Sequence, residues 1–176
     1  RILVCTFLLH QSYKVYKTDV IRKYKLRFDQ NIRRGEDMLF NLEYFKYIDD
    51  VSITDIPLYN YIRYNENSIT LTYNSKMFDE QELLFSNIRD RLKELKVYEK
   101  NKVVLEELYI NRLIISINNL YLNGCPLEKK QRIEEVKRII DSSQVQESIR
   151  EYKSKNWKQF VRKILILTKN ARIIHF

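Results

Sequence analysis

Two adjacent carboxylates, Glu36 and Asp37, follow a glycine at the point where an apolar helix is expected to begin. Acids in the first turn of a helix are stabilised by the helix dipole and by free N–H groups, typically by about 0.3–1 kcal/mol each, so a purely structural role is one explanation. The other explanation is chemical. A carboxylate at the start of a buried helix is partly desolvated, which moves its pKa toward the range of a general base.

The residues after the acids favour the chemical explanation because they predict a buried helix. Apolar side chains cover nearly all faces of this segment: Met38, Leu39, Phe40, Leu42, Tyr44, Phe45, Tyr47 and Ile48. A helix that is apolar on most sides packs inside a protein rather than on its surface. Its N-terminus then presents Glu36 and Asp37 to a confined polar environment.

The chain that must position these acids has two parts with different residue patterns. Up to about residue 73 the pattern is mixed, because residues 51–56 alternate as a strand does and residues 58–63 are again β-prone after Pro57. From about residue 76 apolar residues recur at helical spacing, and residues 103–122 predict a central, well-covered helix that ends before Gly124 and Pro126. We therefore expect an α/β part, residues 1–75, followed by a helical bundle, residues 76–176, and a fold dominated by helices.

Composition excludes several classes of protein. The chain has 176 residues, 44% hydrophobic and 31% charged, and no apolar run approaches the ~18 residues of a membrane-spanning helix. Two glycines cannot form a Gly-rich phosphate loop, and two cysteines at unrelated positions predict a reducing, cytoplasmic location with no metal site. Because the first residue is Arg1 and no secretory signal follows, we expect a piece of a longer chain.

The net charge of +9 is concentrated at one end of the chain. Residues 153–176 contain seven basic residues and no acid, so this segment carries +7. A nucleic-acid binder would more often spread its basic residues over a face of the fold, and we expect no nucleic-acid partner. The segment instead predicts an amphipathic helix with an apolar stripe on one face: Trp157, Phe160, Val161, Ile164, Leu165 and Thr168.

Two interpretations of this basic helix remain open. The apolar stripe can dock on the bundle and leave the charges solvated, or it can lie in an anionic membrane surface, where each basic side chain contributes about 1 kcal/mol. In the second case Trp157, Lys158, Arg162 and Lys163 would face the membrane.

Several short motifs occur in a fixed order between residues 14 and 70: Lys14-Val15-Tyr16, Arg27-Phe28-Asp29, Gly35-Glu36-Asp37, Pro57-Leu58-Tyr59-Asn60-Tyr61 and Asn67-Ser68-Ile69-Thr70. This succession, about a third of the chain, resembles the C-terminal part of the catalytic domain of bacterial family 2 glycosyltransferases. The resemblance implies that residues 1–75 are the acceptor-side remnant of a GT-A domain. It also implies inverting transfer of a sugar from a nucleotide-diphosphate donor to a polysaccharide or lipid-linked acceptor, in polysaccharide biosynthesis.

The resemblance also assigns roles to single residues. Asp37 corresponds to the catalytic base, and Glu36 would hold the acceptor or position the helix start. Tyr59, Tyr61 and Arg63 alternate, so they would share one face of a strand and could bind substrate. The guanidinium of Arg63 would then reach the diphosphate or the acceptor, or else it pairs with an acid of the bundle. Asn60 and Tyr64 depart from the usual pattern of the family around them. In the family, Mg²⁺ or Mn²⁺ is bound by an aspartate-rich motif in the N-terminal half. We therefore expect the metal ligands to lie outside this fragment, and the fragment alone to be inactive.

A different class of function remains open beside the enzyme. The chain would then be a non-catalytic helical interaction module whose basic C-terminus binds a membrane surface or a protein partner. For the enzyme, the acceptor chemistry of the family places it in the cytoplasm, as a peripheral protein at the inner face of the plasma membrane.

Overall fold

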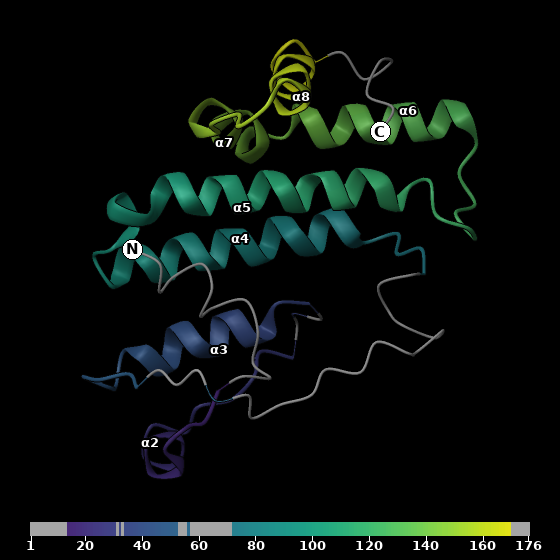
Figure 1. The fold of residues 1–176 in the computed structure, drawn as a ribbon. Helices are drawn as coiled ribbons and strands as arrows, with labels where there is room; N and C mark the ends of the chain where they lie inside the picture. Colours follow the sequence, from purple (N-terminus) through teal and green to yellow (C-terminus); the bar gives the residue numbers. More distant parts are fainter. Residues whose placement is uncertain (1–13, 31, 33, 53–55, 57–71, 170–176) are drawn as a thin grey trace. The chain divides into compact units, whose positions relative to one another are not determined.

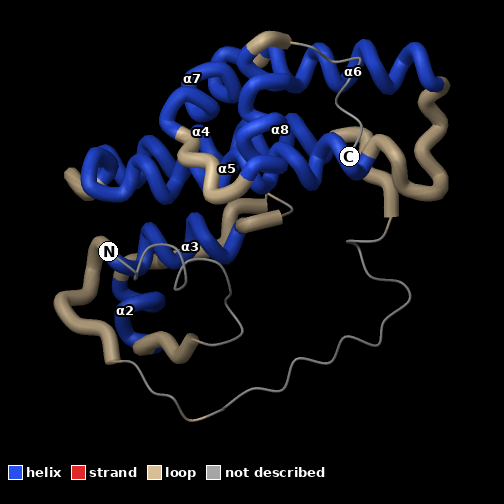
Figure 2. The backbone as a smooth tube through the Cα atoms, turned by 45° about the horizontal axis from the view of Figure 1, so that its top comes forward, coloured by secondary structure: helices blue, strands red, loops and turns tan. Residues whose placement is uncertain are grey.

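The computed structural model describes residues 14–30, 32, 34–52, 56 and 72–169, and in this part of the chain every regular element is a helix (Figures 1 and 2). The expectation of a fold dominated by helices is therefore confirmed for these residues. The helices are α2 (Thr18–Lys23), α3 (Glu36–Phe45), α4 (Met77–Glu94), α5 (Tyr98–Asn119), α6 (Lys129–Asp141), α7 (Ser143–Glu151) and α8 (Trp157–Leu167).

The strands expected at residues 51–56 and 58–63 lie mainly outside the described residues. Val51, Ser52 and Ile56 are described and are not in a strand. The α/β character expected for residues 1–75 stays a prediction.

Contacts within the chain divide it into two compact units. Unit 1 comprises Arg1–Asn65 and Leu83–Asn101, and unit 2 comprises Glu66–Glu82 and Lys102–Phe176. The division therefore passes within α4 and within α5. The boundary expected after residue 75 stays a prediction, and each unit is described here by itself.

Unit 1 has an aromatic core around α3. Leu26, Phe40 and Tyr44 are buried together, and half-buried side chains from the segment before α2, from α2 and from the C-terminal end of α3 pack against them. The Tyr16 ring meets the rings of Phe40 and Tyr44 edge to face, with centroids 5.4 and 5.1 Å apart. Edge-to-face contact is a favoured geometry for aromatic pairs, so residues near position 16 are held against α3.

Unit 2 has a core of aliphatic side chains from consecutive helices. Its fully buried members include Ile110, Leu113, Ile117, Ile139, Ile140 and Ile149. The chain leaves α5 at Asn119 and turns through Gly124, whose φ of +86° lies in the left-handed region that favours glycine.

One expectation for α5 is wrong in part. The sequence predicted a well-covered helix, but Val103, Val104 and Ile115 are exposed at 38%, 39% and 46%. Apolar side chains on most sides of a helix do not guarantee neighbours on most sides, because burial depends on how many elements pack around it. Among the described residues, we find no helix with the length and apolar character needed to cross a membrane.

Candidate functional site

The start of α3 is built around Gly35, which precedes the two acids. Gly35 has a φ of +87°, in the left-handed region, and it is the N-cap residue of the helix. An added Cβ at this position would overlap the buried side chain of Leu84. Both the backbone conformation and the overlap with Leu84 therefore disfavour any residue other than glycine at this position. The glycine fixes where α3 begins.

Asp37 lies half-buried in the first turn of α3. Its Oδ1 accepts a hydrogen bond from the backbone N–H of Met38 at 2.9 Å. The same N–H also donates to the carbonyl of Gly35 at 3.0 Å, so the Asp37 carboxylate shares a donor within the first turn of the helix. Glu36 is also half-buried in this turn.

Two ionisable side chains from the segment before α2 lie within the electrostatic reach of Asp37. Burial lowers the pKa of Lys14 below its ordinary value, and the negative charge of Asp37 partly offsets this effect. Burial, together with the charges of Asp37 and Tyr44, raises the pKa of Tyr16 to about 12. The Tyr16 phenol therefore stays protonated near neutral pH, beside a carboxylate and an amine.

Asn41 completes the cluster, and sequence reasoning missed it. Its side chain is fully buried, and its Oδ1 accepts a hydrogen bond of 2.5 Å from the Tyr16 hydroxyl. Its Nδ2 has no hydrogen-bond partner. The signal that could have identified Asn41 is its spacing of four residues from Asp37, which places both on one side of the helix.

The segment that carries Lys14 and Tyr16 is fixed to α3 by a second phenol. The Tyr44 hydroxyl accepts a hydrogen bond of 2.9 Å from the backbone N–H of Lys17. Tyr16 and Tyr44 therefore hold residues 14–17 beside the helix that bears Asp37. We call Lys14, Tyr16, Asp37 and Asn41 the polar cluster of unit 1.

An unpaired buried atom is not by itself evidence of a site. Gln81 Oε1 and Ser154 Oγ, both in unit 2, are also buried without a partner. Asn41 differs from them because it hydrogen-bonds to a residue under the electrostatic influence of the predicted catalytic acid. An unpaired amide N–H₂ in a buried place costs roughly 1–3 kcal/mol.

A larger polar network in unit 2 is paired within the protein. Glu82 accepts hydrogen bonds from the Tyr109 hydroxyl, from Ser142 Oγ at 3.0 Å and from Gln144 Nε2 at 3.1 Å. These contacts join α4 to α5 and α7 within the unit. We assign this network a structural role.

The residues predicted to bind substrate cannot be placed. Arg63, Tyr59 and Tyr61, predicted to bind substrate, lie outside the described residues. Asp49 and Asp50, which follow the end of α3, are exposed. No group of three or more His, Cys, Asp or Glu side chains that could hold a metal ion occurs among residues the structure describes.

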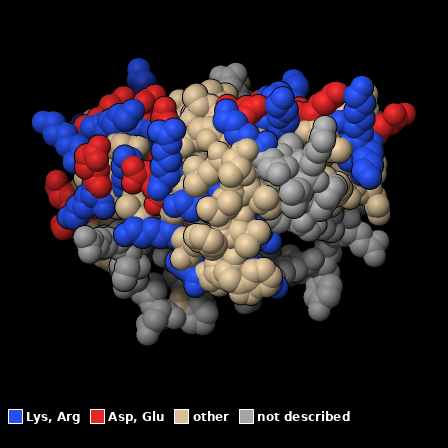
Figure 3. All heavy atoms as spheres, turned by 90° about the horizontal axis from the view of Figure 1, so that it is seen from above, with Lys and Arg blue, Asp and Glu red and all other residues tan. Residues whose placement is uncertain are grey.

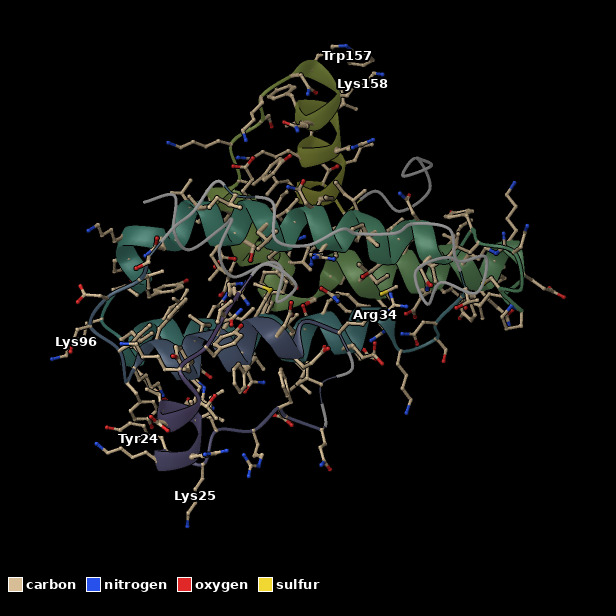
Figure 4. All side chains as sticks on the ribbon, turned by 60° about the horizontal axis from the view of Figure 1, so that its bottom comes forward. Tyr24, Lys25, Arg34, Lys96, Trp157 and Lys158 are labelled. Atoms are coloured by element: carbon tan, nitrogen blue, oxygen red, sulfur yellow. The ribbon has the colours of Figure 1, made fainter. Side chains whose placement is uncertain are left out.

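The four residues predicted to face a membrane all belong to α8. Trp157 and Lys158 are exposed, and Figure 4 shows them at the outer end of α8, pointing away from the other helices of unit 2. Lys163 is half-buried, and its ammonium donates to the backbone oxygen of Tyr152 at 2.6 Å. Arg162 is also half-buried.

The chain matches no protein-family model, no curated protein and no solved structure. The resemblance to family 2 glycosyltransferases therefore rests on the ordered sequence motifs. The polar cluster of unit 1 is an observation independent of that resemblance.

Proposed function

We propose that this chain forms the acceptor side of an inverting glycosyltransferase, in which Asp37 is the general base. The observation that carries the proposal is the polar cluster of unit 1. It lies at the start of an otherwise buried, apolar helix, and it includes a fully buried amide with an unpaired donor. The motif order around Gly35-Glu36-Asp37 supports the same assignment.

In the proposed reaction, Asp37 accepts the proton of an acceptor hydroxyl as that oxygen forms a bond to the anomeric carbon of the donor sugar. The bond from this carbon to the diphosphate oxygen breaks, and its electron pair leaves with the diphosphate. Attack comes from the face opposite the leaving group, so the configuration inverts. A positioned base of this kind contributes typically 10²- to 10⁴-fold to the rate.

The other members of the cluster have positioning roles in this proposal. The hydrogen bond from the Tyr16 hydroxyl to Asn41 Oδ1 holds the segment that carries Lys14 against the helix that carries Asp37. Lys14 lies within the electrostatic reach of the Asp37 carboxylate. None of these groups needs to change its protonation state.

The rest of the enzyme lies outside the described residues in this proposal. The nucleotide-sugar donor and a divalent metal, Mg²⁺ or Mn²⁺, would be bound by a nucleotide-binding half that precedes this chain, so we derive no step through the metal. The acceptor would be a growing polysaccharide or a lipid-linked sugar at the cytoplasmic face of the membrane. The fragment alone would be inactive.

The test measures sugar transfer by the complete gene product, with a panel of nucleotide-diphosphate sugars and extracted lipid-linked acceptors. We expect Asp37→Asn to lower kcat by roughly 10²-fold or more, while the overall fold is kept. Asp50→Asn is the matched control, because Asp50 is an exposed carboxylate of unit 1 outside the cluster. Transfer that survives Asp37→Asn would show that the paired acids only start a helix.

A second candidate function is favoured by a different observation. Trp157, Phe160, Val161 and Ile164 are exposed apolar residues of α8, and a non-catalytic interaction module would need such residues to bind its partner. A complete gene product that transfers no sugar but binds vesicles or a protein partner would support this alternative.

A further inference from the structure

The apolar stripe of α8 is exposed rather than docked. Trp157, Phe160, Val161 and Ile164 are exposed at 71%, 56%, 44% and 42%, and their spacing places all four on one side of the helix. Figure 3 shows uncharged side chains gathered on this side of the molecule, with Lys and Arg side chains beside them. The interpretation in which the stripe packs on the bundle is therefore wrong for these four residues. We call them the α8 face.

Other contacts fix the orientation of α8 in unit 2, so the exposure of this face follows from its packing. Ile166 is completely buried, and its carbonyl accepts a hydrogen bond from Gln146 Nε2 at 3.1 Å. Lys163 Nζ donates to the carbonyls of Tyr152 and Arg150, at 2.6 and 3.4 Å. Turning the α8 face inward would break these contacts.

The start of the helix is also well defined. Asn156 is the N-cap residue, and its Oδ1 accepts a hydrogen bond of 3.0 Å from the N–H of Gln159. The side chain of Gln159 in turn accepts from the N–H of Lys155 at 2.7 Å. These two hydrogen bonds tie Gln159 to the N-cap residue and to the residue before it, so the start of the helix at Trp157 is stabilised without help from the apolar face.

The charges near the α8 face are positive, but only some of them are available to a ligand. Lys155 forms an ion pair with Glu107, and Lys169 pairs with Asp141 at 3.1 Å. Lys153 and Lys158 are exposed, and the Lys158 ammonium lies 6.0 Å from the centroid of the Trp157 ring. No acid occurs between residues 153 and 176.

We propose that the α8 face binds an anionic lipid surface. Its composition favours lipid over a protein groove, because an aromatic residue at the helix end and flanking lysines match an interface of acyl chains below anionic headgroups. Lys163 is not part of this contact, since its ammonium is bound to backbone carbonyls. The proposal does not depend on sugar transfer, because it concerns only unit 2.

The chain contains its own probe for this contact, since Trp157 is its single tryptophan. The first experiment adds vesicles of phosphatidylcholine, with or without 30% phosphatidylglycerol, to the 176-residue chain. We expect a blue shift of Trp157 emission and co-sedimentation with the anionic vesicles only. Glycerol phosphate at the same headgroup concentration should produce no shift, which separates a lipid surface from a free phosphate.

Paired variants test the apolar and the basic parts separately. We expect Phe160→Ser with Val161→Ser to weaken vesicle binding at least tenfold, because two exposed apolar side chains are then no longer available to enter the lipid interface. The matched control is Val104→Ser with Ile115→Ser, which changes two exposed apolar residues of α5 in the same unit. The control should leave vesicle binding unchanged.

The charge variant is Lys153→Gln with Lys158→Gln, and its control is Lys129→Gln with Lys130→Gln in α6. We expect the first pair to lower affinity roughly 25-fold at low salt, about fivefold for each lysine. The control pair should change affinity much less. A rise in salt should weaken binding of the parent chain more than that of the charge variant.

Three results would overturn the proposal. Equal binding to neutral and anionic vesicles would show that charge has no role. A control pair that loses as much vesicle affinity as the α8 pair it is matched with, whether apolar or basic, would show that the α8 face is not the binding surface. A blue shift that follows protein concentration without vesicles, with dimer formation in sedimentation velocity, would assign the face to a second copy of the chain.

Discussion

Helices α3 and α8 are nearly equal in length, with 10 and 11 residues, but most side chains of α3 are buried and most of those of α8 are not. In α3 six residues are buried, including the polar Asn41, whereas in α8 only Ile166 is buried. α3 therefore encloses a polar group in an apolar environment, and α8 leaves an apolar face in water. Each arrangement costs free energy in the isolated chain.

The difference shows that a buried polar group and an exposed apolar face, although both are unfavourable, can each indicate a functional site. A buried, unpaired donor in α3 suits a small polar ligand that enters a confined place. An exposed apolar face in α8 suits an extended partner that covers it.

The first prediction compares the two sides of α8. Ile166→Ala should lower the free energy of unfolding of unit 2 by about 2–5 kcal/mol, because it leaves a cavity at a completely buried position. Ile164→Ala should change it by less than about 0.5 kcal/mol, because this side chain is largely in water and alanine favours a helix. Urea-induced unfolding measures both. Similar losses for the two variants would mean that the α8 face is covered in solution.

The second prediction tests the start of α3 with the only two glycines of the chain. Gly35→Ala should cost about 2–4 kcal/mol, because a left-handed backbone and overlap with Leu84 both oppose the new methyl group. Gly124→Ala has a similar φ but no heavy atom within 4 Å, so only the backbone penalty of about 1–2 kcal/mol applies. Thermal and urea unfolding would rank the variants. Equal losses would show that Leu84 moves aside freely.

The third prediction concerns the hydrogen bond between Tyr16 and Asn41. Tyr16→Phe should lower the free energy of unfolding by about 1–2 kcal/mol, because it leaves the buried amide without a protein partner. Adding Asn41→Leu should bring it back to within about 1 kcal/mol of the parent, since both polar groups are then absent. A double variant that is as unstable as the sum of the single variants would contradict a net cost of the buried amide.

The smallest expected effect is a dependence of stability on alkaline pH. The pKa of Tyr16 is raised to about 12 in the folded chain from an ordinary value of 10.0, so between these values the folded state binds more protons. Its contribution to stability is therefore complete below about pH 10 and is lost as the pH rises toward 12. Tyr16→Phe should lose less stability than the parent between pH 9.5 and 11.5, in urea titrations at each pH. An identical loss in both proteins would show that Tyr16 does not titrate abnormally.

Lys14 should give the free energy of unfolding the opposite dependence on pH. Burial lowers its pKa in the folded chain, so the unfolded state binds more protons just below the ordinary value of 10.5. Stability from this group rises with pH in that window. In Lys14→Met this rise of stability with pH should be absent. The same series of urea titrations distinguishes it from the fall of stability with pH that Tyr16 contributes.

Local features of the fold could be predicted from the sequence. The acids and the apolar run correctly placed the start of α3 at Glu36, because these signals act within one turn of the chain. The helical segments after residue 76 were also predicted, since their apolar residues repeat at helical spacing. The stripe of α8 was recognised for the same reason.

What could not be predicted depends on contacts between segments. The spacing of Trp157, Phe160 and Ile164 does not state whether another helix covers them, and the same holds for Val104 in α5. Asn41 carries no local sign that its side chain is buried or that Tyr16, 25 residues earlier, reaches it. Tertiary packing decides which side chains are buried and which distant residues meet. These contacts cannot be deduced from the local pattern of a single sequence.

The hydrogen bonds of Lys163 have a consequence for the electrostatic behaviour of the basic segment. Its ammonium closes the end of α7 by binding two backbone carbonyls, while Lys155 and Lys169 are matched by acids of α5 and α6. Three of the seven basic residues of this segment are thus already engaged inside the molecule. The effective valence that the segment shows to a charged resin or polyanion is smaller than its formal charge of +7 suggests.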